Sequence, residues 1–396
     1  MTRRVCLVVC CALLVVPAIG AAQDLAIINA RIITGSGTVV DRGTIIVRRG
    51  QIESVGPAAT VPAGLRTIDA RGRTAMPGFI DAHRHINTGP EEKAQMQALL
   101  EAGYTTVLSG GGPADGNITL RDRIDKGEIN GPRVIPSGRI ALTITPDAAR
   151  AEVRRLAQLG VKYTGEIALT PVPGPSPQEL EVLKAIVDEG AKAGVAIQVH
   201  AVSTSAMVAA IDAGVRLLVH VPNKDWVSRA YAEKLAATGT KILATIGFGA
   251  PIFGVFADDN APRFRDGRPW PQSIVDGVKV DGVVTGVEGG YTMVNSRTIW
   301  DAGGMLGYCT DSTYAPLAGL EHELRTYNAM FSMADIIKLM GPNTASYLGE
   351  SAQVGTLEPG KRADIVILDG NPLEGYWNML KAKVVLKGGT VVVDKR

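Results

Sequence analysis

The amino-acid sequence predicts an α/β protein: a (β/α)₈ TIM-like barrel with a small composite β-sandwich formed by both ends of the chain. Three observations lead to this expectation. Amphipathic helices that end at glycine alternate with short apolar strands through the middle of the 396-residue chain. Short β-branched runs gather at its two ends, and histidines stand at the ends of apolar runs in the middle. Such alternation of helices with buried strands is typical of a parallel sheet.

The composition argues against a nucleic-acid-binding protein. The chain has 41 basic and 39 acidic residues, a net charge of +2, and only 5% aromatic residues. The sequence shows no basic cluster that could follow a phosphate backbone. We therefore expect a small-molecule partner and no nucleic acid.

The first 22 residues have the pattern of a secretory signal peptide. Two arginines precede the uncharged residues 5–19, and small residues follow up to Ala22. This is the order of n-region, h-region and cleavage site. We predict removal of residues 1–22, a periplasmic or secreted protein, and no stable membrane insertion after cleavage. An uncleaved anchor is one alternative, and a lipoprotein is another because Cys10 and Cys11 lie in the run.

Residues 23–75 and 353–396 are predicted to form the two parts of the β-sandwich. Short runs of β-branched residues separated by glycine and asparagine indicate strands. The runs are Leu25–Asn29, Arg31–Thr34, Gly43–Arg48 and Gln51–Val55 near the N-terminus, and Asp364–Asp369, Lys383–Lys387 and Thr390–Val393 near the C-terminus.

Residues 76–352 are predicted to form the barrel. Six helices end at a glycine that precedes an apolar strand, namely Gly103, Gly160, Gly194, Gly214, Gly239 and Gly303. Glycine takes the left-handed conformation after a helix. With Phe79–His83 and Arg133–Gly138, the number of expected strands is eight. An open doubly wound sheet is the alternative, but no GxGxxG motif opens a helix in this sequence.

Polar residues recur at one height along these strands. His83 and His85 are two residues apart on a strand, so their side chains point the same way, while Arg84 faces the opposite side for packing or a salt bridge. Six residues after successive helix-ending glycines stand Ser109, Glu166, His200, His220 and Thr245, and Asp311 follows the eighth strand. Barrel enzymes keep their chemistry at the carboxyl ends of the strands.

We therefore predict one ring of metal ligands, composed of His83, His85, Glu166, His200, His220 and Asp311. Imidazoles and carboxylates together suit a divalent metal. We expect one or two ions, with Zn²⁺ the expected metal.

The chain resembles the amidohydrolase superfamily, in its imidazolonepropionase-like and Xaa-Pro-dipeptidase-like group. The matching stretches are Pro77–His85, Gly131–Val134, Gln198–Ala201, Ala213–His220, Thr310–Ser312 and Gly355–Val366. The resemblance covers almost the whole mature chain. It implies a metal-dependent hydrolase with a (β/α)₈ barrel and a composite β-domain.

One position departs from that group. Its members usually carry a carboxylated lysine at the end of strand 4, where this chain reads Lys162–Ile167. The spacing from Gly160 selects Glu166, as in other branches of the superfamily, and Lys162 is the alternative. This exchange leaves open whether the site holds one metal or two.

The resemblance implies hydrolysis by a metal-activated hydroxide. In the two-metal form, the ligand pairs are His83 with His85 and His200 with His220, bridged by Glu166. Asp311 would contact the first ion and act as general base and then general acid.

We predict cleavage of an amide C–N bond in a small molecule such as a dipeptide or an N-acyl amino acid. A lactone, cyclic amide or ester hydrolase with the same metal centre is the alternative, and a non-catalytic metal-binding protein is the third class. Deamination is disfavoured because Val221–Asn223 offers no carboxylate after strand 6.

Three residues are candidate substrate contacts, namely Arg139, Tyr163 and Trp270. Trp270 belongs to residues 248–291, a long segment rich in glycine, proline and charge that we expect to be a lid or binding loop. Barrel enzymes build specificity on such loops. We also expect a homo-oligomer.

Overall fold

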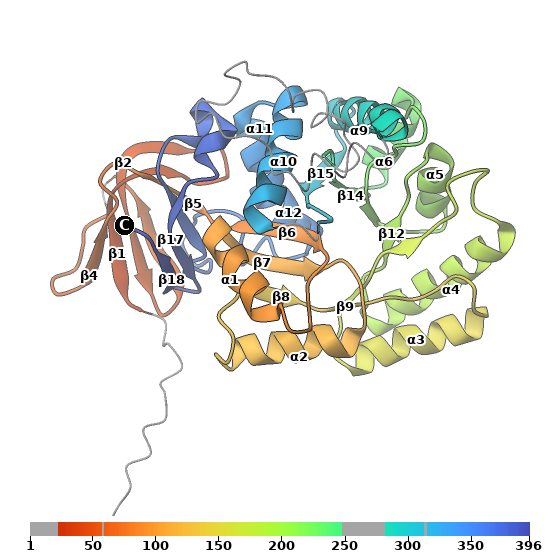
Figure 1. Ribbon diagram of the computed structural model, residues 1–396, viewed down its shortest axis with the longest axis horizontal. Helices are drawn as coiled ribbons and strands as arrows, with labels where there is room; N and C mark the ends of the chain where they lie inside the picture. Colours follow the sequence, from red (N-terminus) through yellow and green to blue (C-terminus); the bar gives the residue numbers. More distant parts are fainter. Residues whose placement is uncertain (1–22, 58, 248–281, 313–314) are drawn as a thin grey trace, which may run out of the picture.

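The computed structural model describes residues 23–57, 59–247, 282–312 and 315–396. Figure 1 shows a sheet made from both ends of the chain beside a larger part in which strands and helices alternate. The expected signal peptide and Trp270 lie outside the described residues. Among the described residues, no helix is long and apolar enough to span a membrane.

Strands from both ends of the chain pair in one sheet. Its members are β1 (Leu25–Ile33), β2 (Val39–Arg48), β3 (Gln51–Gly56), β4 (Arg66–Asp69), β5 (Thr74–Pro77), β16 (Ile365–Leu368), β17 (Ala382–Lys387) and β18 (Thr390–Asp394). The order is β18-β17-β16-β5-β1-β2-β3, with β4 also pairing with β1. The antiparallel pairing of β16 with β5 joins the two ends. Folding of this sheet into a sandwich stays a prediction.

The two runs expected as separate strands around Asn29 form the single strand β1. Asn29 has a φ of 55°, and the register against β2 shifts between Ile27 and Ala30. Asparagine tolerates the left-handed conformation, so the chain passes through a bulge and continues as a strand. The expected turn is therefore an irregularity within one strand.

All eight segments expected as barrel strands contain strands. They are β6 (Phe79–Arg84), β7 (Tyr104–Ser109), β8 (Arg133–Ile135) with β9 (Ser137–Gly138), β10 (Tyr163–Thr164) with β11 (Ile167–Ala168), β12 (Gln198–His200), β13 (Leu217–Val219), β14 (Lys241–Ala244) and β15 (Met305–Tyr308). The third segment breaks at Pro136, which has no N–H to donate. The pairings β6-β7-β8, β9-β10 and β11-β12-β13-β14-β15 are parallel.

The fold is TIM-barrel-like, with helices between successive strands (Figure 1). The helices are α1 (Glu92–Ala102), α2 (Ala114–Asp125), α3 (Pro146–Gln158), α4 (Pro177–Ala193), α5 (Thr204–Asp212), α6 (Arg229–Ala237), α9 (Gly282–Asp301), α10 (Pro316–Met330), α11 (Met333–Lys338) and α12 (Thr344–Tyr347). Among the described residues, an isolated parallel bridge between Tyr163 of β10 and Ala196, just before β12, links two of the three parallel sheets, but strand pairing does not close the ring. A closed barrel therefore stays a prediction.

The helix-ending glycines behave as the sequence predicts. Gly103, Gly160, Gly194, Gly214, Gly239 and Gly303 all have φ values between 67° and 103°. This conformation is strained for residues with a side chain. One expectation about irregular structure was wrong: the part of residues 248–291 that begins at Gly282 belongs to helix α9.

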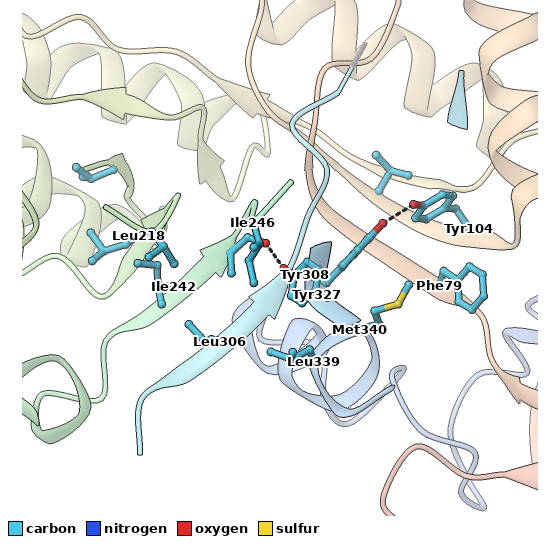
Figure 2. Packing of buried hydrophobic residues seen from close by; sticks show 14 of the residues in the cluster. Phe79, Tyr104, Leu218, Ile242, Ile246, Leu306, Tyr308, Tyr327, Leu339 and Met340 are labelled. Atoms are coloured by element: carbon cyan, nitrogen blue, oxygen red, sulfur yellow. Dashed lines mark hydrogen bonds between the residues drawn. The ribbon is translucent and has the colours of Figure 1, made fainter. Parts of the chain in front are cut away.

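A buried apolar core fills the space between the strands and helices. Figure 2 shows Leu218, Ile242 and Leu306, all fully buried on neighbouring strands. The hydroxyls of Tyr104 and Tyr308 lie 2.8 Å apart, which satisfies two polar groups inside the core. This core supports the strands on whose ends the polar residues lie.

A partly buried ion pair joins the terminal sheet to the barrel strands. Arg133 Nη1, on β8, donates to Asp364 Oδ2 at 2.9 Å and to Thr106 Oγ1 at 2.8 Å. Asp364 directly precedes β16, is almost fully buried, and accepts a further hydrogen bond from the Gly388 N–H at 2.7 Å. Its carboxylate therefore ties three segments together.

We expect Asp364→Ala to lower the free energy of unfolding by about 2–4 kcal/mol, because it leaves a partly buried guanidinium without its partner. Denaturant unfolding followed by circular dichroism measures this change. Asp147→Ala is the control: Asp147 pairs with Arg150 on the surface, and its loss should matter much less. Equal effects of the two substitutions would contradict a structural role for the Asp364 pair.

Candidate metal centre

Six polar side chains meet at the carboxyl ends of the parallel strands. His83 lies near the end of β6 and His85 just after it, while His200 ends β12 and His220 follows β13. Glu166 lies between β10 and β11, and Asp311 follows β15. Ligand atoms of three sets lie within 4.8 Å of one another: His83, His220 and Asp311; His83, His85 and Glu166; and Glu166, His200 and His220.

Glu166 stands between the histidines. Its Oε2 lies 2.9 Å from His200 Nδ1, 3.3 Å from His220 Nε2 and 3.7 Å from His83 Nε2. Burial opposes ionisation, but the hydrogen bonds from His200 and His220 outweigh it and lower the pKa of the Glu166 carboxyl. Glu166 is therefore a carboxylate at neutral pH.

Asp311 lies on the opposite side of the same cluster. Its Oδ1 is 3.0 Å from His85 Nε2 and 3.1 Å from His83 Nε2, and its Oδ2 is 3.6 Å from His220 Nε2. Burial raises the pKa of Asp311, yet the contacts with His83 and His85 lower it by more than burial raises it. The nearby Asp311 carboxylate in turn raises the pKa of His85.

The unpaired atoms of the cluster suit a metal ion. Among the described residues, His83 Nε2 and Asp311 Oδ1 are buried and neither makes a hydrogen bond of acceptable geometry. Buried polar atoms normally have partners, so these two lone-pair donors are arranged for another ligand. Imidazole nitrogens and carboxylate oxygens in this number fit one or two divalent ions.

The backbone around the cluster is strained at two of the six residues. His220 has a φ of 68° and Asp311 a φ of 48°, both in the left-handed region. Such strain persists only where the surroundings enforce it. The His220 ring is fixed by a hydrogen bond between Nδ1 and Thr245 Oγ1, and the Asp311 N–H donates to the His83 carbonyl at 2.9 Å.

A second group of residues fixes Thr310, the residue that directly precedes Asp311. The carboxylate of Asp81 accepts hydrogen bonds from the Thr310 N–H at 3.1 Å and the Thr310 hydroxyl at 2.6 Å. Arg84, fully buried, donates to the same hydroxyl at 3.0 Å and lies 3.7 Å from Asp81, so the expected packing and salt-bridge role is confirmed. We did not single out Asp81 from the sequence, although it lies two residues before His83.

The candidate substrate contacts fall into different places. Arg139 follows β9, is largely exposed, and its Nη2 lies 3.7 Å from Glu166 Oε1. The Tyr163 hydroxyl points away from the cluster and donates to the Leu348 carbonyl. Burial raises the pKa of this hydroxyl to about 12. Lys162 is exposed and outside the cluster. Trp270 lies outside the described residues.

The model of the amidohydrolase family matches residues 137–393. The chain belongs to this family. It is 24% identical to the imidazolonepropionase of Geobacillus kaustophilus over 90% of this chain and 91% of that protein. It is 26% identical to the enamidase of Eubacterium barkeri, again over 90% and 91%.

Solved structures agree with this membership. A prolidase-like protein from Bifidobacterium longum superposes with a TM-score of 0.79 at 26% identity, covering 95% of this chain and 97% of that one. A Xaa-Pro dipeptidase with methionine bound in its active site gives a TM-score of 0.75 at 20% identity, covering 93% and 99%. The chain is thus an amidohydrolase of the imidazolonepropionase and Xaa-Pro dipeptidase type, a metal-dependent hydrolase acting on carbon–nitrogen bonds.

We expect Gly110→Ala to weaken metal binding about 10- to 100-fold. A Cβ at Gly110 would lie 2.9 Å from His83 Nε2, so the imidazole must move. Calorimetric titration of the demetallated protein with Zn²⁺ measures the affinity. Gly290→Ala, at a helical position with open space around it, is the control and should bind metal normally. Unchanged affinity in Gly110→Ala would show that His83 is not a ligand.

Proposed function

We propose that this amidohydrolase cleaves the amide bond of a dipeptide or N-acyl amino acid at a centre of one or two divalent ions, with Zn²⁺ the favoured metal. One observation carries the proposal. The set of His83, His85 and Glu166 and the set of Glu166, His200 and His220 share a single carboxylate. Two adjoining ligand sets with a common member are suited to a pair of ions bridged by Glu166.

Asp311 is the proposed general base and acid. A divalent ion in the cluster would lower the pKa of a water molecule and polarise the substrate carbonyl. The Asp311 carboxylate stays ionised because its pKa is lowered, so it can accept the proton of the attacking water. Its contacts with His83 and His85 hold it in one orientation, from which it returns the proton to the leaving nitrogen.

Arg139 is the proposed contact for the carboxylate of the leaving amino acid. Its guanidinium lies on the Oε1 side of Glu166, and more than half of the side chain is exposed to solvent. A planar guanidinium can bind a carboxylate with two parallel hydrogen bonds. This placement supports a leaving group that carries a carboxylate, such as an amino acid, more than a leaving group without a charge.

We further propose that residues 1–22 direct export and are then removed, that residues 76–352 close into one barrel with the strands of residues 23–75 and 353–396 as its sandwich, and that the enzyme is a homo-oligomer. The order of residue types in the N-terminal segment supports the first of these points. N-terminal sequencing of the protein isolated from its native host tests cleavage directly.

We expect Asp311→Asn to lower kcat about 10²- to 10⁴-fold for an N-acyl amino acid with little change in KM, since the amide cannot act as a base. Release of the amino acid is measured against matched lactones and esters, before and after removal of metal with a chelator. Metal content, determined alongside, separates loss of the base from loss of an ion. Full activity after complete demetallation, or turnover of lactones alone, would contradict the proposed reaction.

We expect Arg139→Met to raise KM about tenfold or more for substrates with a free carboxylate, because an ionic hydrogen bond is lost. The same substrates with the carboxylate converted to a primary amide are the control, and their KM should not change. Steady-state kinetics with both series decides the point. Parallel losses in the two series would assign Arg139 to support of Glu166 and not to the substrate.

A further inference from the structure

A cavity opens beside the candidate metal centre. Its volume is about 270 Å³, and its walls include His200, His220, Val202 and Asn223. Two of the proposed metal ligands are thus part of the wall. A molecule that enters the cavity lies next to the candidate metal centre.

The side chain of Asn223 is an unpaired polar group in this wall. Asn223 is only 6% exposed, and its Oδ1 has no hydrogen-bond partner among the residues that the structure describes. A buried amide oxygen without a donor costs free energy, and native proteins retain few of them. A ligand with an N–H group would supply the missing donor.

The loop that carries Asn223 is held from two sides. Asn295, fully buried on α9, donates from Nδ2 to the Pro222 carbonyl at 2.9 Å and to the Asp225 carbonyl at 2.8 Å. Its Oδ1 accepts from the Val227 N–H at 2.9 Å. Backbone N–H groups of Asn223 and Lys224 also donate to the Val202 carbonyl, at 2.8 and 3.1 Å. The position of the Asn223 amide is therefore fixed before a ligand arrives.

The cavity wall and Arg139 adjoin different oxygens of Glu166. Arg139 approaches Oε1, whereas His200 and His220, which border the cavity, contact Oε2. If Arg139 receives the leaving amino acid, as the proposed function requires, the acyl half of the substrate enters the cavity. The chemistry of the cavity wall then selects the acyl half.

Resting on that proposed function, we infer that Asn223 is a specificity-determining residue that accepts a hydrogen bond from a neutral N–H on the acyl half of the substrate. An ammonium group would bring a charge and three donors to the single acceptor oxygen of Asn223, whereas an acylated nitrogen brings one neutral donor. Burial beside Asn223 therefore costs less free energy for the acylated nitrogen. The enzyme would thus prefer N-acylated dipeptides to free ones.

Three ligands that differ in one group test this inference: N-acetylalanylglycine, its ester analogue O-acetyllactoylglycine, in which oxygen replaces the N–H, and alanylglycine. Dissociation constants are measured by calorimetry with the metal-loaded full chain carrying Asp311→Asn, so that the ligands are not consumed. We expect N-acetylalanylglycine to bind about tenfold or more tightly than the ester analogue. Adding Asn223→Leu, of similar volume but without an acceptor, should bring this ratio close to one.

Val202→Ala is the matched control, because it alters an apolar part of the same wall and should leave the ratio unchanged. Asn223→Ala is the second variant if the leucine variant does not fold. A ratio near one before substitution, a ratio that survives loss of Asn223, or the absence of binding by either ligand would overturn the inference. Tighter binding of alanylglycine than of N-acetylalanylglycine would contradict the inference that the donor is a neutral N–H.

Release of glycine by the chain with Asp311 intact separates this inference from the proposed function. If glycine is released but the binding ratio does not change when Asn223 is replaced, the proposed hydrolysis is supported and the inference about Asn223 is wrong. A ratio that depends on Asn223 without glycine release supports the binding role and ends the proposed amide hydrolysis for this class of substrate.

Discussion

The carboxylate of Glu166 is the interaction on which the rest of the candidate site depends. Its Oε2 faces His83, His200 and His220 within 3.7 Å. These imidazoles also lie close to one another, with ring centroids 4.6 Å apart for His200 and His220 and 5.6 Å apart for His83 and His220. Protons or metal ions bound to these rings would repel one another at such distances. The two carboxylates of the cluster are therefore needed to balance that positive charge.

The ligand residues lie at the ends of strands, and their positions are fixed by neighbouring residues that are not ligands themselves. Asp81 and Arg84 hold Thr310, which fixes the strained backbone of Asp311. Asn295 holds the loop after His220 from the neighbouring helix. Side chains that make no contact with a substrate thus determine the positions of those that do, which is the usual requirement of a preorganised site.

The sequence made much of this site predictable because strands repeat. Equal spacing from Gly160, Gly194 and Gly214 placed Glu166, His200 and His220 at one height, and the structure brings all three within hydrogen-bonding distance or close to it. Spacing along a strand does not report contacts between strands. Spacing therefore did not single out Asp81, whose partner Thr310 is 229 positions away. The place of Tyr163 within strand 4 likewise gave no sign that its hydroxyl bonds to the Leu348 carbonyl.

The same limit applies to the fold. Glycine positions predicted the helix ends because a helix end depends on the backbone conformation of one residue. The continuity of β1 through Asn29 depends instead on its partner strand β2. The break at Pro136 is local, yet its effect is to separate the pairings of β8 and β9. Local chemistry thus predicted the elements, and pairing decided how they join.

The pairing of β16 with β5 also links the candidate site to the C-terminal end of the chain. β5 continues through Gly78, whose N–H donates to the Asp364 carbonyl at 2.9 Å, straight into the strand that bears His83. A growing polypeptide that has already released all six ligand residues still lacks the partner that clamps this strand. The N-terminal end of the His83 strand is therefore anchored by a segment that lies after all six ligand residues in the chain.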